Sequence, residues 1–184
     1  MAFARRIVDP ESLYFITFAT IQWVDVFTRD IYVDILLNSI RYCQKEKGLK
    51  IHAWCIMSNH VHLLIATEPG HHPSDVLRDL KKFTSKKIIA AIEDENLPES
   101  RRSWMLWLFS SAGKNNPKNK AYQFWQQENH PIEIFSNKFI EQKLAYIHNN
   151  PVKAGIVDDP WEYRYSSARD YMNNQKGLLH VDLL

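Results

Sequence analysis

The chain has little cysteine and no long apolar run. Its two cysteines, Cys43 and Cys55, lack the spacing of a C-x-x-C motif, so we interpret them as small buried side chains in a reducing compartment. The first residues, MAFARRIVDPES, lack the apolar segment of a signal peptide, and the longest apolar runs are far too short to span a bilayer. These absences predict a soluble, cytoplasmic protein.

Neither sign of charge dominates the sequence. The 23 Lys and Arg residues and the 21 Asp and Glu residues give a formal net charge of +2, which falls short of the basic excess typical of a protein that binds nucleic acid through its overall charge. Internal repeats and low-complexity linkers are also absent. The 184 residues, 45% of them hydrophobic, are enough for one domain with an ample core. Any contact with nucleic acid must therefore depend on a local cluster of charge.

The segment 51–66, IHAWCIMSNHVHLLIA, predicts two short strands joined at Ser58 and Asn59, residue types that suit a tight reversal. Because successive side chains of a strand point to opposite faces, His60 and His62 share one face. Neutral imidazole is the commonest nitrogen ligand of first-row divalent metals. The pair thus predicts an open metal site suited to Lewis-acid chemistry on a phosphate or carbonyl. Solvated or hydrogen-bonded histidines remain the alternative.

Strand and helix patterns alternate along the rest of the chain. The expected elements are a strand over 13–20, a helix over 30–47, the two strands above, a helix from Ser74 or Asp75 to about 95, a short aromatic helix over 101–112, a strand over 121–135 broken at Pro131, a helix from Ser136 through Asn149, and a short closing helix. Pro151 is expected to end the helix before it. The order predicts an α+β fold with a split βαβ sheet, a central antiparallel sheet with helices on one side.

The second long predicted helix carries the densest basic stripe. Arg78, Lys82 and Lys86 are spaced four residues apart, and Lys81 and Lys87 lie beside them. A row of cations at helical pitch can contact successive phosphates of DNA. The same stripe can also be only the solvated face of an amphipathic helix. DNA binding by Arg78, Lys81, Lys82 and Lys86 is therefore a hypothesis.

Residues 96–121 form the least regular part, which we interpret as an insertion into a single domain over 1–184, with a C-terminal extension over 151–184. The short helix of this insertion carries Trp104 and Trp107. Aromatic side chains next to cations can stack unpaired bases. We expect these tryptophans instead to dock the insertion on the main core.

The last long predicted helix places Tyr146 at the flank of its apolar stripe and Asn150 one turn later, with His148 roughly opposite that stripe. Tyrosine is a poor nucleophile at its free pKa of about 10. A divalent metal held by two histidines helps by polarising the scissile phosphate. The product is a phosphotyrosine linkage, which conserves the energy of the broken bond. Core packing for Tyr146 and helix-stop chemistry for Asn150 are the alternatives.

Several motifs occur in an order typical of one family. They are SNHVHLL, LRDLKKFTSKKI, YQFWQQENHPIEI, YIHNNPVKAGIV and WEYRYSSARDY. SNHVHLL resembles the HUH motif of the single-tyrosine transposases of insertion sequences. The last two motifs resemble the C-terminal signature of the branch called REP-associated tyrosine transposases. The resemblance covers nearly the whole chain from Leu13 to Tyr171.

This resemblance implies a ferredoxin-like HUH fold and an enzyme that cleaves and rejoins single-stranded DNA, often at hairpin or repeat ends. The reaction would pass through a covalent 5′-phosphotyrosine intermediate. By position, His60 and His62 are the metal-ligating histidines, Tyr146 is the nucleophile and Asn150 is the third polar ligand. Mg²⁺ or Mn²⁺ is the implied ion. Such a protein would be associated with the bacterial nucleoid, as a monomer or a homodimer.

The sequence is also compatible with other functions. Split βαβ sheets also host RNA-binding modules, which stack bases on strand aromatics, whereas this chain has His60 and His62 in such positions. A domesticated relative could process repeat elements without transposing. A metallohydrolase without a covalent intermediate would usually need a further carboxylate, and the nearest one downstream, Glu68, lies beyond the strand.

Overall fold

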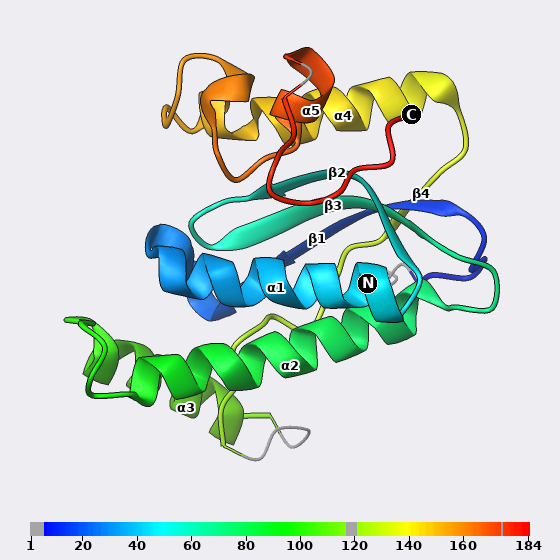
Figure 1. Ribbon diagram of the computed structural model, residues 1–184. Helices are drawn as coiled ribbons and strands as arrows, with labels where there is room; N and C mark the ends of the chain where they lie inside the picture. The colour runs from blue at the N-terminus through cyan, green and yellow to red at the C-terminus, as the bar shows by residue number, and fades with distance from the viewer. Residues whose placement is uncertain (1–5, 117–120, 174) are drawn as a thin grey trace.

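The computed structural model describes residues 6–116, 121–173 and 175–184, and its centre is a four-stranded antiparallel sheet (Figure 1). The strands are β1 (Leu13–Ala19), β2 (Leu49–Ile56), β3 (His60–Thr67) and β4 (Ile132–Ile134). They lie in the order β2-β3-β1-β4. This is the order of a split βαβ sandwich, in which two sequence-distant strands become central neighbours. The expected fold class is confirmed.

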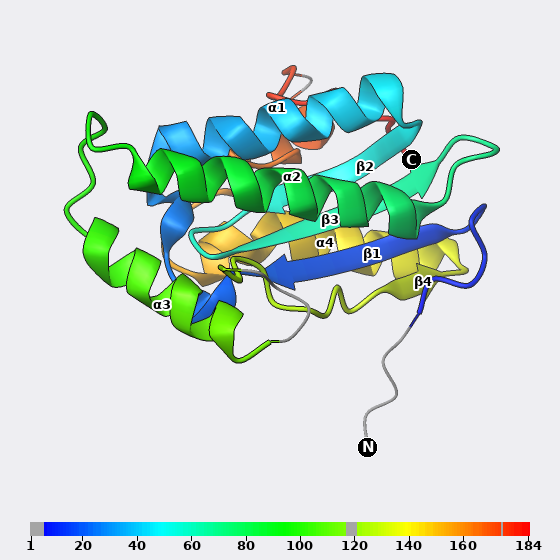
Figure 2. The same ribbon diagram turned by 90° about the horizontal axis from the view of Figure 1, so that it is seen from below.

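The helices cover both faces of this sheet (Figures 1 and 2). They are α1 (Asp30–Glu46), α2 (Pro73–Glu93), α3 (Arg102–Lys114), α4 (Asn137–Lys153) and α5 (Ala168–Met172), with 3-10 turns η1 (Ile21–Trp23), η2 (Val26–Thr28) and η3 (Pro160–Glu162). The expectation of helices on one side holds for α1 and α2. On the opposite face, α4 packs against β2 and β3.

A second helical layer is needed because the central strands are apolar on both faces. Val61, Leu63 and Ile65 of β3 belong to the larger core, which α1 and α2 cover. Leu64 of β3 belongs to a smaller core, which includes Ile147 of α4. The alternation that buries Leu64 under α4 also turns His60 and His62 toward that helix.

Two element boundaries differ from the expectation. Helix α2 begins at Pro73, and His72 is its N-cap, because the His72 ring accepts a hydrogen bond of 3.2 Å from the Ser74 amide. Proline suits the first position of a helix, where a backbone N–H would have no partner. The fourth strand is only Ile132–Ile134. Two residues prevent strand pairing before it. His130 has a left-handed backbone (φ 40°), and Pro131 has no N–H to donate to a neighbouring strand.

Helix α4 does not end at Pro151. It begins after Ser136, whose hydroxyl accepts from the Phe139 amide, and it continues through a buried Pro151 to Lys153. The fixed φ of proline is compatible with helix, and the ring costs one intrahelical hydrogen bond. The helix stops instead before Gly155, whose φ of 70° is typical of the residue after a C-cap. Asn150 therefore stays helical, one turn beyond Tyr146.

The insertion carries α3, whose apolar face differs from the expected one. Met105, Leu108 and Phe109, spaced three and four apart, are buried in the larger core. Trp104 and Trp107 are 51% and 63% exposed on the other side of the helix. The expectation that these tryptophans dock the insertion was wrong, because the Met105 face already does so. Residues 117–120 lie outside the described part.

Two further expectations concern the cysteines and membrane-spanning segments. Cys43 and Cys55 are both free and buried. Within the described ranges, no helix has the length and apolar character needed to cross a membrane.

Candidate metal centre and nucleophile

His60 and His62 lie on β3 with their ring centroids 4.7 Å apart, on the face that α4 covers. The amide nitrogen of Asn150 lies 3.1 Å from Nε2 of His62. The structure thus brings together the three side chains that the sequence suggested as metal ligands. A β-strand and a helix supply them from positions 88 residues apart.

The proton of His60 is placed by Asn59. The Asn59 amide nitrogen donates to two acceptors, the carbonyl oxygen of Trp23 at 3.1 Å and a carboxylate oxygen of Asp25 at 2.9 Å. Its oxygen must then face Nδ1 of His60, 2.7 Å away. Because a carbonyl oxygen only accepts, His60 carries its proton on Nδ1. Its Nε2 lone pair is left for a ligand.

His62 is held in the same tautomer from the neighbouring strand. Thr17 on β1 pairs with His62 across the sheet, and its hydroxyl lies 2.8 Å from Nδ1. Because the Asn150 amide faces Nε2, the ring proton is on Nδ1 and is donated to Thr17. Such partners fix the orientation of histidines that bind metals.

Burial keeps both rings neutral. It lowers the pKa of His60, and it lowers the pKa of His62 to about 3, with smaller contributions from the protonated form of His60 and from the charge of Lys143. A neutral imidazole has the lone pair that a metal requires. The environment therefore favours the form that can bind a cation at neutral pH.

Tyr146 stands at the open side of this cluster and is 41% exposed. Its ring lies 5.2 Å from the ring of His62 and 5.7 Å from that of Phe15, edge to face in both cases. The ammonium groups of Lys143 and Lys153 lie 5.6 and 5.7 Å from its ring centroid. The side chain is not part of the core, and two cations flank it.

Four residues near the cluster were not singled out from the sequence: Thr17, Trp23, Asn59 and Lys143. Lys143 precedes Tyr146 by three positions, so helical spacing could have found it. Asn59 was interpreted only as a turn residue. The role of Thr17 depends on the β1–β3 register, which places it opposite His62 and which sequence periodicity does not specify.

Trp23 lies in a strained turn beside His60. Gln22 and Trp23 have φ angles of 50° and 55°, in the left-handed region, which costs roughly 1–3 kcal/mol for each residue that is not glycine. The indole is 53% exposed, and its ring lies 5.5 Å from that of His60 at 73°. Strain of this kind often accompanies function.

The sequence places His148 roughly opposite the apolar stripe of α4, but this side of the helix is buried as well. His148 is buried, and its Nε2 lies 2.9 Å from the hydroxyl of Ser167. The C-terminal extension, including Tyr171, covers this second face of the helix. Burial lowers the pKa of His148 to about 4, so this is a structural histidine.

The basic side chains of α2 have different environments in the structure. Arg78 is ion-paired with Asp75 and Asp79. Lys81 is largely enclosed and donates to the carbonyl of Gln126 at 2.8 Å and to Asn129 Oδ1 at 2.6 Å, and burial lowers its pKa to about 8. Lys81 thus holds the segment before β4 in place.

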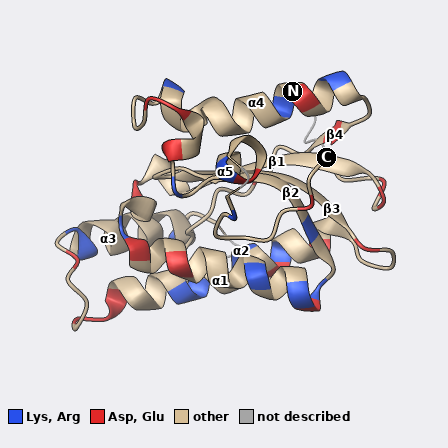
Figure 3. Ribbon diagram, turned by 45° about the horizontal axis from the view of Figure 1, so that its top comes forward, with Lys and Arg blue, Asp and Glu red and all other residues tan. Residues whose placement is uncertain are grey.

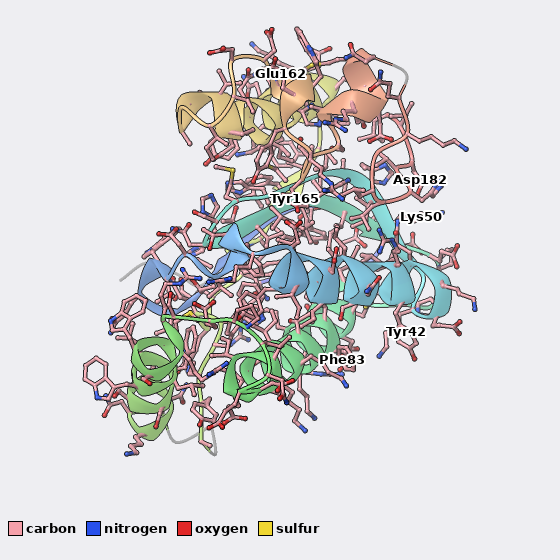
Figure 4. The ribbon with its side chains drawn as sticks, turned by 60° about the vertical axis from the view of Figure 1, so that its left-hand side comes forward. Tyr42, Lys50, Phe83, Glu162, Tyr165 and Asp182 are labelled. Carbon is pink, nitrogen blue, oxygen red and sulfur yellow. The ribbon has the colours of Figure 1, made fainter. Side chains whose placement is uncertain are left out.

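Lys82 and Lys86 are exposed and line a groove of about 630 Å³ between α1 and α2. Tyr42 and Phe83 border the same groove, on the side of the molecule away from α4 (Figure 4). Basic and acidic residues are interspersed along both helices (Figure 3). The exposed lysines of α2 therefore lie across the sheet from His60, His62 and Tyr146.

Among the residues that the structure describes, no group of three or more His, Cys, Asp or Glu side chains is arranged to hold a metal ion. The cluster on β3 and α4 differs from such groups because its third member is an amide. Two imidazole nitrogens and one amide leave room for oxygen ligands from water or a substrate.

Comparison with known proteins adds a family to this geometry. The family model described as "Transposase IS200 like" matches residues 11–110, more than half of the chain. No curated protein matches.

Two solved structures are similar. The first, described as a REP-associated tyrosine transposase bound to a REP hairpin, is 18% identical with a TM-score of 0.67, over 100% of this chain and 94% of that one. The second, a putative transposase from Deinococcus radiodurans, is 21% identical with a TM-score of 0.47, over 81% of this chain and 97% of that one. The first likeness shows a shared fold. With the match over residues 11–110, the chain belongs to the IS200-like transposase family.

Proposed function

We propose that this transposase depends on a divalent metal and cuts and rejoins single-stranded DNA, with Tyr146 as the nucleophile. The observation that carries the proposal is the convergence of four side chains. Tyr146 and Asn150 lie one turn apart on α4, and both approach His62.

The donor set fits a small divalent cation such as Mg²⁺ or Mn²⁺. Both histidines present Nε2 lone pairs because Asn59 and Thr17 engage their Nδ1 atoms. Rotation of the Asn150 amide would present its oxygen, the donor type that these ions prefer. When bound, the ion would polarise the scissile phosphate and stabilise charge on its oxygens.

The protein side chains account for the remaining steps. Tyr146 Oη releases its proton and forms a bond to phosphorus, while the bond from phosphorus to the 3′ oxygen breaks and that oxygen takes up a proton. The products are a 5′-phosphotyrosine and a strand that ends in a 3′ hydroxyl. Attack by a 3′ hydroxyl on the phosphotyrosine then re-forms a phosphodiester and frees the tyrosine. Lys143 and Lys153, which flank the ring, would offset the charge of the phosphate.

The proposed substrate is an unpaired strand next to a hairpin or repeat end. The similar structure bound to a REP hairpin supports this choice, as do the exposed Lys82 and Lys86. Because a single chain supplies Tyr146 and the ligands, we propose that the tyrosine acts in cis, with a monomer as the active unit.

The test is a denaturing-gel assay with labelled single-stranded hairpin DNA from the flanks of the gene, with and without Mn²⁺. The wild type is expected to form a metal-dependent adduct that resists detergent, and Tyr146→Phe is expected to form none. Tyr42→Phe, which changes another exposed tyrosine on the far side of the sheet, is the matched control and should form the adduct. Cutting without an adduct, equal in all three proteins, would indicate a hydrolytic nuclease and refute the role of Tyr146.

A further inference from the structure

The turn after β1 carries an exposed indole that the proposed chemistry leaves unused. Trp23 lies in η1, at the end of β1 where Ala19 pairs with His60. About half of its surface is exposed, so the larger core does not account for its position. The same turn contacts α3 near one end of the sheet (Figure 2).

Asn59 ties the backbone of Trp23 to the proposed metal ligand. One amide donates to the Trp23 carbonyl at 3.1 Å and accepts from the His60 ring at 2.7 Å. The backbone carbonyl of Asn59 also accepts from the Thr20 amide at 2.9 Å. The left-handed backbone at Gln22 and Trp23 is thus held from both of its ends. A shift of the Trp23 backbone relative to His60 would break these contacts.

An exposed indole next to a site for phosphate chemistry has a natural ligand. Every nucleobase has a flat π face, and stacking on an aromatic side chain is a general means of binding single strands. The ring of Trp23 meets that of His60 edge to face at 5.5 Å, so one indole face need not be covered by the histidine. A base that stacks there belongs to a nucleotide close to the phosphate that Tyr146 attacks.

We propose that Trp23 is a stacking platform for one unpaired nucleobase next to the scissile phosphate, held in register with His60 by Asn59. The inference rests on the proposed function for the identity of the ligand as single-stranded DNA. It adds a specific binding residue and a reason for the strained turn. Stacking positions the strand without reading its sequence, because all four bases can stack.

The experiment measures DNA binding without metal, so that it does not depend on cleavage. Fluorescence anisotropy is recorded with a labelled hairpin whose unpaired flank carries a single abasic nucleotide at each position in turn. Wild type, Trp23→Ala, Trp23→Phe and Trp23→Gly are compared, and Trp107→Ala is the control for loss of an exposed tryptophan. Trp23→Gly is included because glycine adopts the left-handed backbone freely.

For the intact strand, Trp23→Ala and Trp23→Gly are expected to weaken binding on the order of tenfold, whereas Trp23→Phe retains most of the affinity. One abasic position should weaken binding by the wild type to a similar extent and have no further effect on Trp23→Gly. Trp107→Ala should respond to abasic nucleotides as the wild type does. The proposal is overturned if Trp23→Gly and the wild type lose the same affinity at every abasic position.

The two proposals fail separately. If the wild type forms no tyrosine adduct but one abasic position still depends on Trp23, the proposed chemistry fails and the platform stands. If the adduct forms but no abasic position depends on Trp23, the chemistry stands and the platform is refuted.

Discussion

The contact between Thr17 and His62 allows a sharp test of how the site is prepared for a metal. Thr17→Val removes the hydroxyl that lies 2.8 Å from Nδ1 of His62 and leaves a β-branched side chain of almost the same size. The ring N–H then has no partner in a buried position, which costs roughly 1–3 kcal/mol. His62 can avoid part of this cost by moving its proton to Nε2, the atom that must bind the metal.

The penalty is therefore expected to appear as lost metal affinity. Loss of a partner that orients a metal-binding histidine typically costs about 10- to 100-fold in affinity, which is about 1.4–2.7 kcal/mol. Calorimetric titration of the protein with Mn²⁺, without DNA, measures this directly. Urea unfolding of the same samples reports any loss of stability.

Thr67→Val is the matched control. Thr67 is a buried threonine at the opposite end of β3, and its hydroxyl donates to the His71 carbonyl at 3.0 Å. This variant should lose stability yet bind Mn²⁺ as the wild type does. If Thr17→Val binds Mn²⁺ within twofold of the wild type, the reasoning about the tautomer of His62 is refuted.

Three further outcomes are expected. His60→Ala should abolish cleavage of the hairpin and leave its affinity, measured by anisotropy, within about twofold; unchanged cleavage would end the metal assignment. Changing Lys82 and Lys86 together to Ala should weaken DNA binding and reduce the slope of log affinity against log salt by about 1.4, and an unchanged slope would show that these lysines touch no phosphate. Because burial lowers the pKa of His148 to about 4, below the unfolded value of about 6.5, the folded state binds a proton less readily and loses stability as pH falls from about 6.5 toward 4. At pH 5 this loss is about 2 kcal/mol, so urea unfolding at pH 5 and 7 should show a smaller difference for His148→Gln than for the wild type, and an equal difference would contradict this account.

The sequence predicts the parts of the fold in which periodicity is strong. The alternation at His60, Val61 and His62 specifies which face each side chain takes, and the structure agrees because a strand has only two faces. For a helix, the sequence is less reliable in predicting which side is buried. His148 is buried by the C-terminal extension, a contact between distant segments that one apolar stripe on α4 does not reveal. The same limit applies to Thr17, whose place beside His62 depends on register.

The sheet separates two sets of side chains that the proposed function requires to meet one DNA molecule. Helix α2, which carries the exposed lysines, lies beyond one face, and α4, which carries Tyr146, lies on the other (Figure 1). A strand that reaches from one set to the other must pass around an edge of the sheet over roughly 15–20 Å, which is about five nucleotides at the stacked spacing of about 3.4 Å along one strand. Duplex DNA is too stiff to turn so sharply over this distance. If both contacts are made at once, the thickness of the protein itself selects substrates that carry an unpaired tail of sufficient length.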